Sequence, residues 1–151
     1  MYKIILAVSD DGFIADKNGK IPWYIPHDLK WFKMNTYNSS IIMGRNTWET
    51  FIKPLSHRKN MIISRSKLKC LNQFHSVASA KEYLKSNDGW IIGGRVAEEF
   101  YASGILFYLT YVHTNIKQGT KINIPNMKNI WRSQTFYKNG YHYTFTINII
   151  L

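Results

Sequence analysis

The sequence predicts an α/β fold: a single domain with a mostly parallel central sheet, flanking helices and an antiparallel hairpin at its C-terminal end. Two observations predict this class. Between residues 2 and 102, short apolar runs alternate with segments of helical spacing, which is the pattern of parallel βαβ chains. Near the end, Asn139-Gly140 separates two strand-like segments, and this dipeptide is the strongest short-range hairpin signal.

Length and composition predict one globular domain spanning residues 1–151. The chain has 45% hydrophobic and 15% aromatic residues, which excludes a disordered polypeptide. A domain of this length buries roughly 70% of its unfolded surface, so it needs no disulfide or metal in order to fold. Cys70 is the only cysteine and the five histidines show no metal-ligand spacing, so we expect no metal site and a reducing, cytoplasmic location.

The apolar stretches of the chain do not predict a membrane segment. Ile4 to Val8 is too short for a signal peptide and is followed by two acids, so it predicts a strand instead. The long uncharged stretch that starts at Phe100 and runs up to Lys117 is interrupted by hydroxyl, amide and glycine residues. We therefore expect no membrane partner.

In the first half of the chain we expect three strands, because three short apolar runs are bounded by turn residues: Tyr2 to Ser9, Ser40 to Met43 and Asn60 to Ser64. Pro26 favours the first position of a helix that extends to about Thr36. Asn46 is a candidate N-cap for a short helix through Phe51. Residues 10–25 contain many turn-forming residues, and we expect a long ordered loop there.

In the second half the pattern predicts two further helices and three more strands. Ser79 is expected to cap a helix through Lys85, with Glu82 completing a capping box. The other helix is expected after a tight turn at Gly93-Gly94, from Arg95 to Ala102. The strands are a weak one at His75 to Val77, one at Trp90 to Ile92 and a longer one at Leu106 to Val112.

The C-terminal hairpin is expected to pair Thr135 to Lys138 with Tyr141 to Leu151. Its second strand alternates in character from residue to residue, as a strand with two different faces does. Apolar side chains share one face and polar side chains share the other: Tyr141, Tyr143, Phe145, Ile147 and Ile149 against His142, Thr144, Thr146 and Asn148.

The chain is strongly basic, with 20 Lys+Arg against 9 Asp+Glu and a net charge of +11. The excess lies in the later two thirds, since residues 1–50 carry 6 bases and 5 acids whereas residues 101–151 carry 5 bases and no acid. Charge alone leaves three interpretations open: a nucleic-acid surface, a basic surface that keeps the protein in solution, and a pocket for small anionic ligands.

Asp28 is the acid that the sequence singles out, because it lies near the start of a predicted helix among Trp23, Leu29, Trp31 and Phe32. One interpretation is an acid that complements the helix dipole. The other is a lone carboxylate at the edge of an apolar cleft, where it would pair with a cationic or amidine-like ring. No second acid is close in sequence, so paired-carboxylate hydrolysis has no local support.

Three predicted strand ends carry polar or cationic residues: Gly44-Arg45-Asn46-Thr47, Ser64-Arg65 and Gly93-Gly94. Open α/β sheets bind their ligands at the carboxyl ends of parallel strands, and amides at a helix start bind phosphate. A simple tight turn also explains the glycine pair when it is taken alone. Together, the three strand ends suit a ligand that carries several phosphates.

Two segments resemble the signature of the dihydrofolate reductase family: Ile21 to Lys33, which contains Pro26-His27-Asp28-Leu29, and Ile42 to Glu49, which contains Met43-Gly44-Arg45-Asn46-Thr47-Trp48. Further similarity follows in order along essentially the whole chain, at Pro54-Leu55, Arg58-Lys59-Asn60, Ile91-Ile92-Gly93-Gly94, Tyr108-Leu109-Thr110 and the final hairpin. The resemblance implies a central sheet of eight strands, mostly parallel, with four helices and no covalently attached cofactor.

For the substrate, the resemblance implies that Asp28 binds the 2-amino group and ring nitrogen N3 of a pterin. Thr110 would support that contact through its hydroxyl and an ordered water, which Trp23 would help to hold, and these three residues form the implied catalytic set. Arg58 would pair with the α-carboxylate of the substrate's glutamate tail. The apolar walls would be formed by Ile5, Ala7, Leu29, Phe32, Phe51 and Leu55.

For the cofactor, the resemblance implies NADPH. Its phosphates, including the 2′-phosphate, would be held by Arg45, Thr47, Ser64 and Arg65. The nicotinamide and pyrophosphate would face Ile14, Ile92, Gly93 and Gly94, and the implied cofactor set also includes Ala7, Gly44 and Asn46.

The activity implied by the resemblance is NADPH-dependent reduction of 7,8-dihydrofolate to 5,6,7,8-tetrahydrofolate, in support of one-carbon metabolism. A hydride would go to pterin C6 and a proton to N5. The resemblance also implies inhibition by antifolates and a monomer, with no nucleic acid as the main partner. Two alternatives stay open: a related pterin reductase or riboflavin-pathway pyrimidine reductase, which Asp11 to Ala15 also resembles, and a basic nucleic-acid-binding module.

Overall fold

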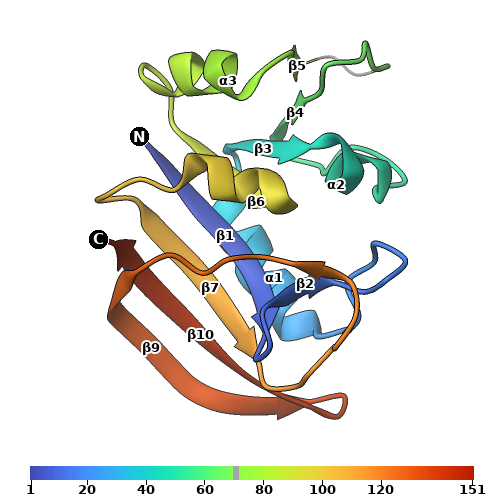
Figure 1. Ribbon diagram of the computed structural model, residues 1–151, viewed down its shortest axis with the longest axis vertical. Helices are drawn as coiled ribbons and strands as arrows, with labels where there is room; N and C mark the ends of the chain where they lie inside the picture. The colour runs from blue at the N-terminus through green and yellow to red at the C-terminus, as the bar shows by residue number, and fades with distance from the viewer. Residues whose placement is uncertain (70–71) are drawn as a thin grey trace.

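The structure, a computed structural model, describes residues 1–69 and 72–151 and confirms the predicted α/β class. Its main sheet has eight strands in the order β5-β4-β3-β6-β1-β7-β10-β9 (Figure 1). Neighbouring strands run parallel except at β10, which is antiparallel to both β7 and β9. The strands are β1 (Tyr2–Ser9), β3 (Ser40–Gly44), β4 (Lys59–Ile63), β5 (Gln73–Phe74), β6 (Gly89–Gly93), β7 (Leu106–Val112), β9 (Met127–Lys138) and β10 (Tyr141–Ile150).

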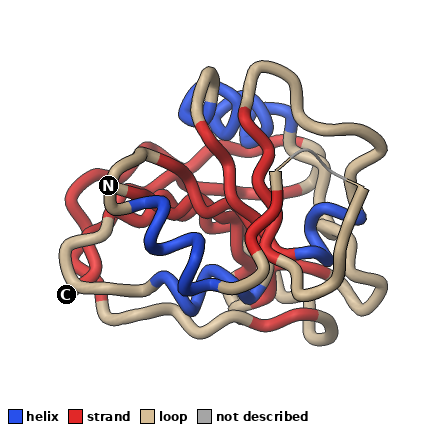
Figure 2. The backbone as a smooth tube through the Cα atoms, turned by 90° about the horizontal axis from the view of Figure 1, so that it is seen from above, coloured by secondary structure: helices blue, strands red, loops and turns tan. Residues whose placement is uncertain are grey.

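The helical segments lie outside the layer of strands, as the view from above in Figure 2 shows. They are α1 (Pro26–Thr36), α2 (Arg45–Glu49), α3 (Val77–Leu84) and the 3₁₀ helix η1 (Arg95–Phe100). The number of helical segments in the described part of the chain therefore agrees with the four implied, and one of the four is a 3₁₀ helix. No helix in the described residues is both long and apolar enough to span a membrane.

The central strand β1 is buried on both faces, which explains its nearly continuous apolar sequence. Ile4 and Val8 belong to a core cluster that also contains Phe100 from η1. Ile5 points to the opposite face and belongs to a cluster against which Phe32 from α1 packs. Because side chains alternate along a strand, β1 separates these two apolar layers.

The predicted starts of two helices are wrong. Ser76 is the N-cap of α3, since its Oγ accepts a hydrogen bond from the backbone N–H of Ser79 at 3.0 Å. Ser79 therefore lies inside the helix, and its own hydroxyl donates to the Ser76 carbonyl at 2.9 Å. Gly44 occupies the N-cap position of α2, so Asn46 lies within that helix and does not cap it.

Three further element boundaries differ from the prediction. The weak strand is Gln73–Phe74, and the residues predicted for it, His75 to Val77, instead lead into α3. The segment after the glycine pair is a 3₁₀ helix that ends at Phe100, two residues before the predicted end. In the hairpin, β9 begins at Met127 rather than Thr135, because its first residues also pair with the end of β10.

The hairpin turn itself is confirmed. Asn139 and Gly140 both have positive φ, 53° and 84°, as a type I′ turn requires. On the polar face of β10, His142 is exposed, whereas Thr144, Thr146 and Asn148 are buried and form hydrogen bonds. Thr146 donates to the Leu109 carbonyl at 2.6 Å, and Asn148 donates to the Thr146 hydroxyl at 2.9 Å.

The predicted long loop at residues 10–25 contains a short strand, β2 (Phe13–Ala15), which pairs with β8 (Thr120–Lys121) in a second, two-stranded sheet. Gly119 makes this pairing possible, because a Cβ there would lie 2.0 Å from the Ala15 carbonyl oxygen. Asp11 accepts hydrogen bonds from the backbone N–H groups of Ile116 and Lys117. The loop is therefore fastened to the segment between β7 and β9.

Candidate active site

The sheet places Asp28 and Thr110 in direct contact. Thr110 lies in β7 opposite Ala7 of β1, and its side chain points to the face covered by α1. Pro26 opens α1, so Asp28 falls in the first turn of the helix. The Thr110 hydroxyl donates a hydrogen bond of 2.8 Å to Asp28 Oδ1, which fixes the carboxylate against the interior strand β7.

The environment of Asp28 is electrostatically unusual. Burial raises the pKa of the Asp28 carboxyl to about 6, and the hydrogen bond from Thr110 opposes that rise. A carboxyl with such a pKa changes its charge close to neutral pH. The site therefore has one titratable acid that can pair with a cationic or amidine-like group entering from solvent.

Trp23 and the C-terminal hairpin form the aromatic side of this site. Trp23 is 7% exposed and packs in a cluster with Val112 and Phe145. Trp31, one helical turn after Asp28, stacks on Phe145 with ring centroids 4.7 Å apart. The indole N–H of Trp31 is buried without a hydrogen-bond partner among the described residues.

Most of the predicted wall residues come together in one apolar cluster, against which α1 packs. Ile5 is buried, and Phe32, Phe51 and Leu55 pack against the same core cluster. Ala7 packs instead against the cluster that contains Trp23. The sixth residue, Leu29, is 52% exposed and lies at the rim.

Arg58 lies near the far end of α1. Its Nη1 donates to the Thr36 hydroxyl at 3.4 Å, and its Nε donates to the Ser56 carbonyl at 2.8 Å. Partial burial lowers the pKa of the guanidinium, which nevertheless keeps its charge. Thr36 is eight residues after Asp28, so about 12 Å of helix rise separates Asp28 from the residue whose hydroxyl Arg58 contacts. A carboxyl group and a guanidinium therefore lie near opposite ends of α1.

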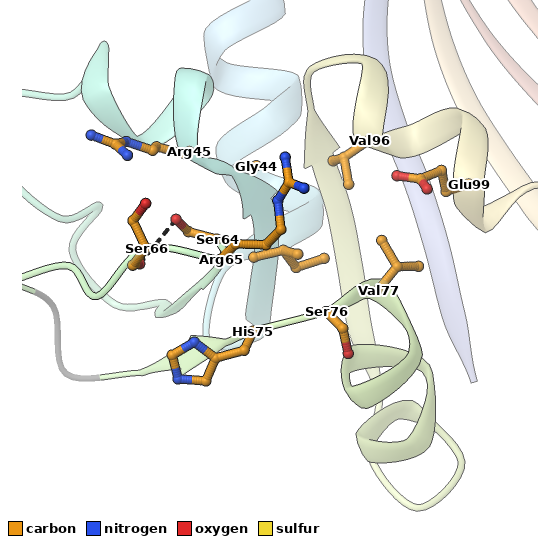
Figure 3. A pocket seen from close by; sticks show the side chains of 11 residues that line it. Gly44, Arg45, Ser64, Arg65, Ser66, His75, Ser76, Val77, Val96 and Glu99 are labelled. Atoms are coloured by element: carbon orange, nitrogen blue, oxygen red, sulfur yellow. Dashed lines mark hydrogen bonds between the residues drawn. The ribbon is translucent and has the colours of Figure 1, made fainter.

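A cavity of about 570 Å³ lies at the carboxyl ends of β3, β4 and β5. Four of the predicted cofactor residues line it: Gly44, Arg45, Ser64 and Arg65. Figure 3 shows the Arg65 side chain extending across the cavity from β4 toward Gly44 and Val96. The Ser64 hydroxyl donates to the Ser66 carbonyl at 3.1 Å, and Arg45 pairs with Glu49 at 2.7 Å.

Several other residues that line this cavity are not predicted from the sequence: Ser66, His75, Ser76, Val77, Val96 and Glu99. The place of these residues in the cavity depends on the strand order and not on a local sequence pattern. His75 and Ser76 follow β5 directly, and the strand order places β5 beside β4, which ends at Ile63. A correct boundary for β5 would have aligned His75 with Ser64 and Arg65 at the same edge of the sheet.

Gly93 and Gly94 lie against Thr47, which confirms that two of the predicted strand ends meet. A Cβ on Gly93 would lie 2.8 Å from both Cγ2 and Oγ1 of Thr47. Gly94 has φ of 73° and its Cβ would lie 3.2 Å from Thr47 Oγ1. These residues, together with Ala7, Ile14, Asn46 and Ile92, do not line the 570 Å³ cavity. No group of three or more potential metal ligands occurs in the described residues.

The whole chain matches a known family. A family model described as "Dihydrofolate reductase" matches residues 1–149. This chain belongs to the dihydrofolate reductase family. It is 38% identical over 157 aligned residues to a dihydrofolate reductase of Buchnera aphidicola subsp. Acyrthosiphon pisum, and the alignment covers 95% of this chain and 96% of that protein. A dihydrofolate reductase of Mycobacterium tuberculosis (strain H37Rv) is 29% identical over 155 residues, covering 95% and 94%.

A solved structure shows the same fold. It is described as "Dihydrofolate reductase from Enterococcus faecalis complexed with NADP(H)and RAB-propyl", and it superposes on this dihydrofolate reductase family member with a TM-score of 0.87. The superposition covers 99% of this chain and 95% of that one at 24% sequence identity. The likeness therefore covers nearly the whole of the fold described above.

Proposed function

We propose that this chain reduces 7,8-dihydrofolate to 5,6,7,8-tetrahydrofolate with NADPH as the reductant. The observation that carries the proposal is the contact between Asp28 and Thr110: a partly buried carboxyl, oriented by a hydroxyl, at the mouth of an apolar site. The membership of the dihydrofolate reductase family, over nearly the full length, supports the same activity.

Asp28 binds the pterin ring in this proposal. Its carboxylate accepts hydrogen bonds from the 2-amino group and N3. The Thr110 hydroxyl, which donates to Asp28 Oδ1, holds the carboxylate in position for these contacts. Because the carboxylate is in a medium of low polarity, it stabilises positive charge on the ring and so promotes protonation at N5 without touching that atom. Trp23 closes the side of the site toward residues 10–25 and helps to hold a water there, which limits access of bulk solvent.

The rest of the substrate lies along α1 toward Arg58. Ile5, Phe32, Phe51 and Leu55 contact the apolar middle of the molecule, and Leu29 covers it at the rim. The Arg58 guanidinium pairs with the α-carboxylate of the glutamate tail. Thr36 and the Ser56 carbonyl already orient this guanidinium, so little side-chain freedom is lost on binding.

The residues present fit NADPH. Arg45, Ser64 and Arg65 line one cavity and supply two cations and a hydroxyl for the 2′-phosphate. Gly93 and Gly94 allow Thr47 to pack against the glycine pair, because a Cβ on Gly93 would lie 2.8 Å from the Thr47 side chain. In this proposal the backbone amides of this turn, at the start of η1, contact the pyrophosphate. NADPH, when bound, supplies the hydride that reduces pterin C6. Ile14 and Ile92, each 9% exposed, provide apolar surface for the nicotinamide end of the site.

We further propose that the enzyme acts as a monomer in the cytoplasm, where its product serves one-carbon metabolism. The lone Cys70 is compatible with a reducing compartment. Compounds that carry an amidine-like diamino ring would pair with Asp28 in the same manner as the pterin, so antifolates are the expected inhibitors. Part of the positive charge serves the two anionic ligands, at Arg45, Arg58 and Arg65, so nucleic acid is not expected as the main partner.

A single assay tests the proposal. The absorbance of the nicotinamide is followed with NADPH and dihydrofolate, in the presence and absence of a folate-analogue inhibitor. We expect oxidation of NADPH that requires dihydrofolate and stops with the inhibitor. Oxidation that requires a ribosylaminopyrimidine instead would assign the chain to the pyrimidine reductases. Tight and steeply salt-dependent binding of DNA or RNA, without reductase activity, would support the nucleic-acid module.

A further inference from the structure

A second hollow lies on the face of the sheet opposite Asp28. It measures about 370 Å³ and is formed by β7, β10, β9 and residues 124–127, which lead into β9. Tyr111 lines it, and Tyr111 follows Thr110 in β7. Because successive side chains of a strand point to opposite faces, Tyr111 is directed away from the Asp28 site. The hollow is therefore separate from the substrate and cofactor sites.

The buried polar side chains at the base of the hollow, which we call its floor, already have hydrogen-bond partners. Thr146 and Asn148 of β10 line the hollow and are only 1% and 4% exposed. Thr146 donates to the Leu109 carbonyl, and Asn148 donates to the Phe107 carbonyl and the Thr146 hydroxyl. The Asn148 carbonyl oxygen accepts from Asn129 at 3.0 Å. These groups fix the shape of the hollow and have little hydrogen-bonding capacity left for a ligand.

Two polar side chains that line the hollow above this floor have unused hydrogen-bonding capacity. Arg132 forms no ion pair, and the Tyr111 hydroxyl makes no hydrogen bond, within the part of the chain that the structure describes. The two are close enough that the charge of Arg132 lowers the pKa of Tyr111, although burial raises it more. Both can donate hydrogen bonds into the same space.

The surroundings favour an anion. The lining contains no carboxylate, and residues 101–151 contain no acid at all against 5 bases. Ile124, Pro125 and Met127 form an apolar side next to the two donors. A guanidinium and a phenol hydroxyl beside apolar surface suit a small organic molecule with an oxyanion at one end and an apolar ring or chain at the other.

We propose that this hollow is a second ligand site, which binds a small organic oxyanion through Arg132 and Tyr111. The oxyanion accepts hydrogen bonds from the guanidinium and the phenol hydroxyl. The apolar part of the ligand covers Pro125 and Met127. The site is distinct from the site of dihydrofolate reduction, so it can be occupied while that site is full.

The test is a titration of the ¹⁵N-labelled chain with phenyl phosphate, followed by NMR. NADPH and a folate-analogue inhibitor are present throughout, so that the anion sites around Arg58 and Arg65 are blocked. We expect saturable shifts of the side-chain amides of Asn129 and Asn148, with affinity in the millimolar range. Benzoate should produce the same pattern of shifts, and the neutral analogue benzamide should not.

Variants separate a specific site from general attraction to a basic surface. Arg132→Gln should weaken binding about tenfold or more, since it removes a charge-assisted donor, and Tyr111→Phe about threefold. Both variants leave Thr146 and Asn148 of the floor unchanged. Each variant tests the proposal by itself, so one remains informative if the other folds poorly. Lys128→Gln removes the same charge from the same strand, outside the hollow, and should change the affinity less than twofold.

Three results would overturn the proposal. One is the lack of saturable shifts at Asn129 and Asn148 with phenyl phosphate. The second is equal weakening by Lys128→Gln and Arg132→Gln, which would mean that only the overall charge attracts the anion. The third is equal binding of benzamide, which would mean that the oxyanion has no specific contact. None of these results bears on dihydrofolate reduction, which is measured separately.

Discussion

The Thr110 hydroxyl donates a 2.8 Å hydrogen bond to Asp28 Oδ1, although the two residues are 82 positions apart in the sequence. Thr110 comes from the core of the sheet and Asp28 from the first turn of α1. The bond thus fixes the helix start relative to β7, and it holds an acid whose pKa is raised to about 6 by burial. The contact thus fixes the position of the carboxyl and, by favouring its charged form, opposes the rise in pKa that burial causes.

Asp28→Asn tests the role of the carboxylate in catalysis. The amide retains the shape and can still accept from Thr110, but it cannot carry the charge that stabilises a cationic pterin. We expect kcat/KM for dihydrofolate to fall roughly 10- to 100-fold near neutral pH, as for loss of a hydrogen bond to a charged group. Steady-state oxidation of NADPH measures this. Asp88→Asn, at an exposed acid remote from the site, is the matched control, and full activity in the Asp28 variant would remove the assigned role.

The same variant makes a prediction about stability. Because burial raises the pKa of Asp28 from 3.8 to about 6, the native state binds this proton more tightly than the unfolded chain. The ionised carboxyl therefore costs stability above pH 6, and the cost disappears as the pH falls from about 6 to about 4. We expect Asp28→Asn to be more stable than the parent by about 1 to 3 kcal/mol at neutral pH and equal to it near pH 4. Urea unfolding at both pH values checks this, and a difference that does not depend on pH would contradict it.

Elements with local signals were predicted well from the sequence. The bounds of β1 and of α1 agree with the prediction, because the apolar run and Pro26 act through their own neighbours. The hairpin turn was found because Asn139-Gly140 has the backbone conformation that the turn requires. The prediction failed where two residues compete for one role, as Ser76 and Ser79 do at the start of α3.

The parts of the site that depend on strand order could not be derived from local pattern. The residues around Asp28 left two interpretations open, an acid that complements the helix dipole and a carboxylate at the edge of an apolar cleft. They did not identify Thr110 as its partner, which came from the family resemblance. The cavity residues His75 and Ser76 become neighbours of Arg65 only because β5 pairs with β4. The start of β9 at Met127 depends likewise on pairing with the far end of β10.

Thr110→Val tests the positioning of Asp28. Valine has the shape of threonine but has no hydroxyl, so the carboxyl loses the bond that stabilises its charged form. We expect the pKa of Asp28 to rise further, since the hydrogen bond from Thr110 now lowers it, and kcat/KM to fall about tenfold. The pH profiles of kcat/KM and of stability should both shift to higher pH. Thr114→Val, in the segment that follows β7, is the control, and an unshifted profile in Thr110→Val would contradict the prediction.

Arg65→Gln tests the assignment of the cavity to the 2′-phosphate. The variant removes one of the cations that line the cavity, and only NADPH carries the phosphate in question. We expect KM for NADPH to rise roughly 10- to 100-fold while KM for NADH changes little. Lys67→Gln removes the same charge two residues later, outside the cavity, and should leave both values unchanged. A parallel rise in KM for both cofactors would assign Arg65 to another part of the molecule.

Gly93→Ala and its compensation by Thr47→Ala test the contact between the two strand ends. A methyl group on Gly93 would lie 2.8 Å from Cγ2 and Oγ1 of Thr47, and both atoms belong to a side chain that alanine shortens. We expect Gly93→Ala to lower the free energy of unfolding by about 1 to 3 kcal/mol, as for an overpacked core position. The double variant should regain a large part of that loss, because the Thr47 Cβ, at 3.3 Å, is the nearest atom left. Urea unfolding of the four proteins in the cycle gives the coupling energy. If the two losses simply add, the glycine pair is not packed on Thr47, and the proposed contact between the two strand ends is wrong.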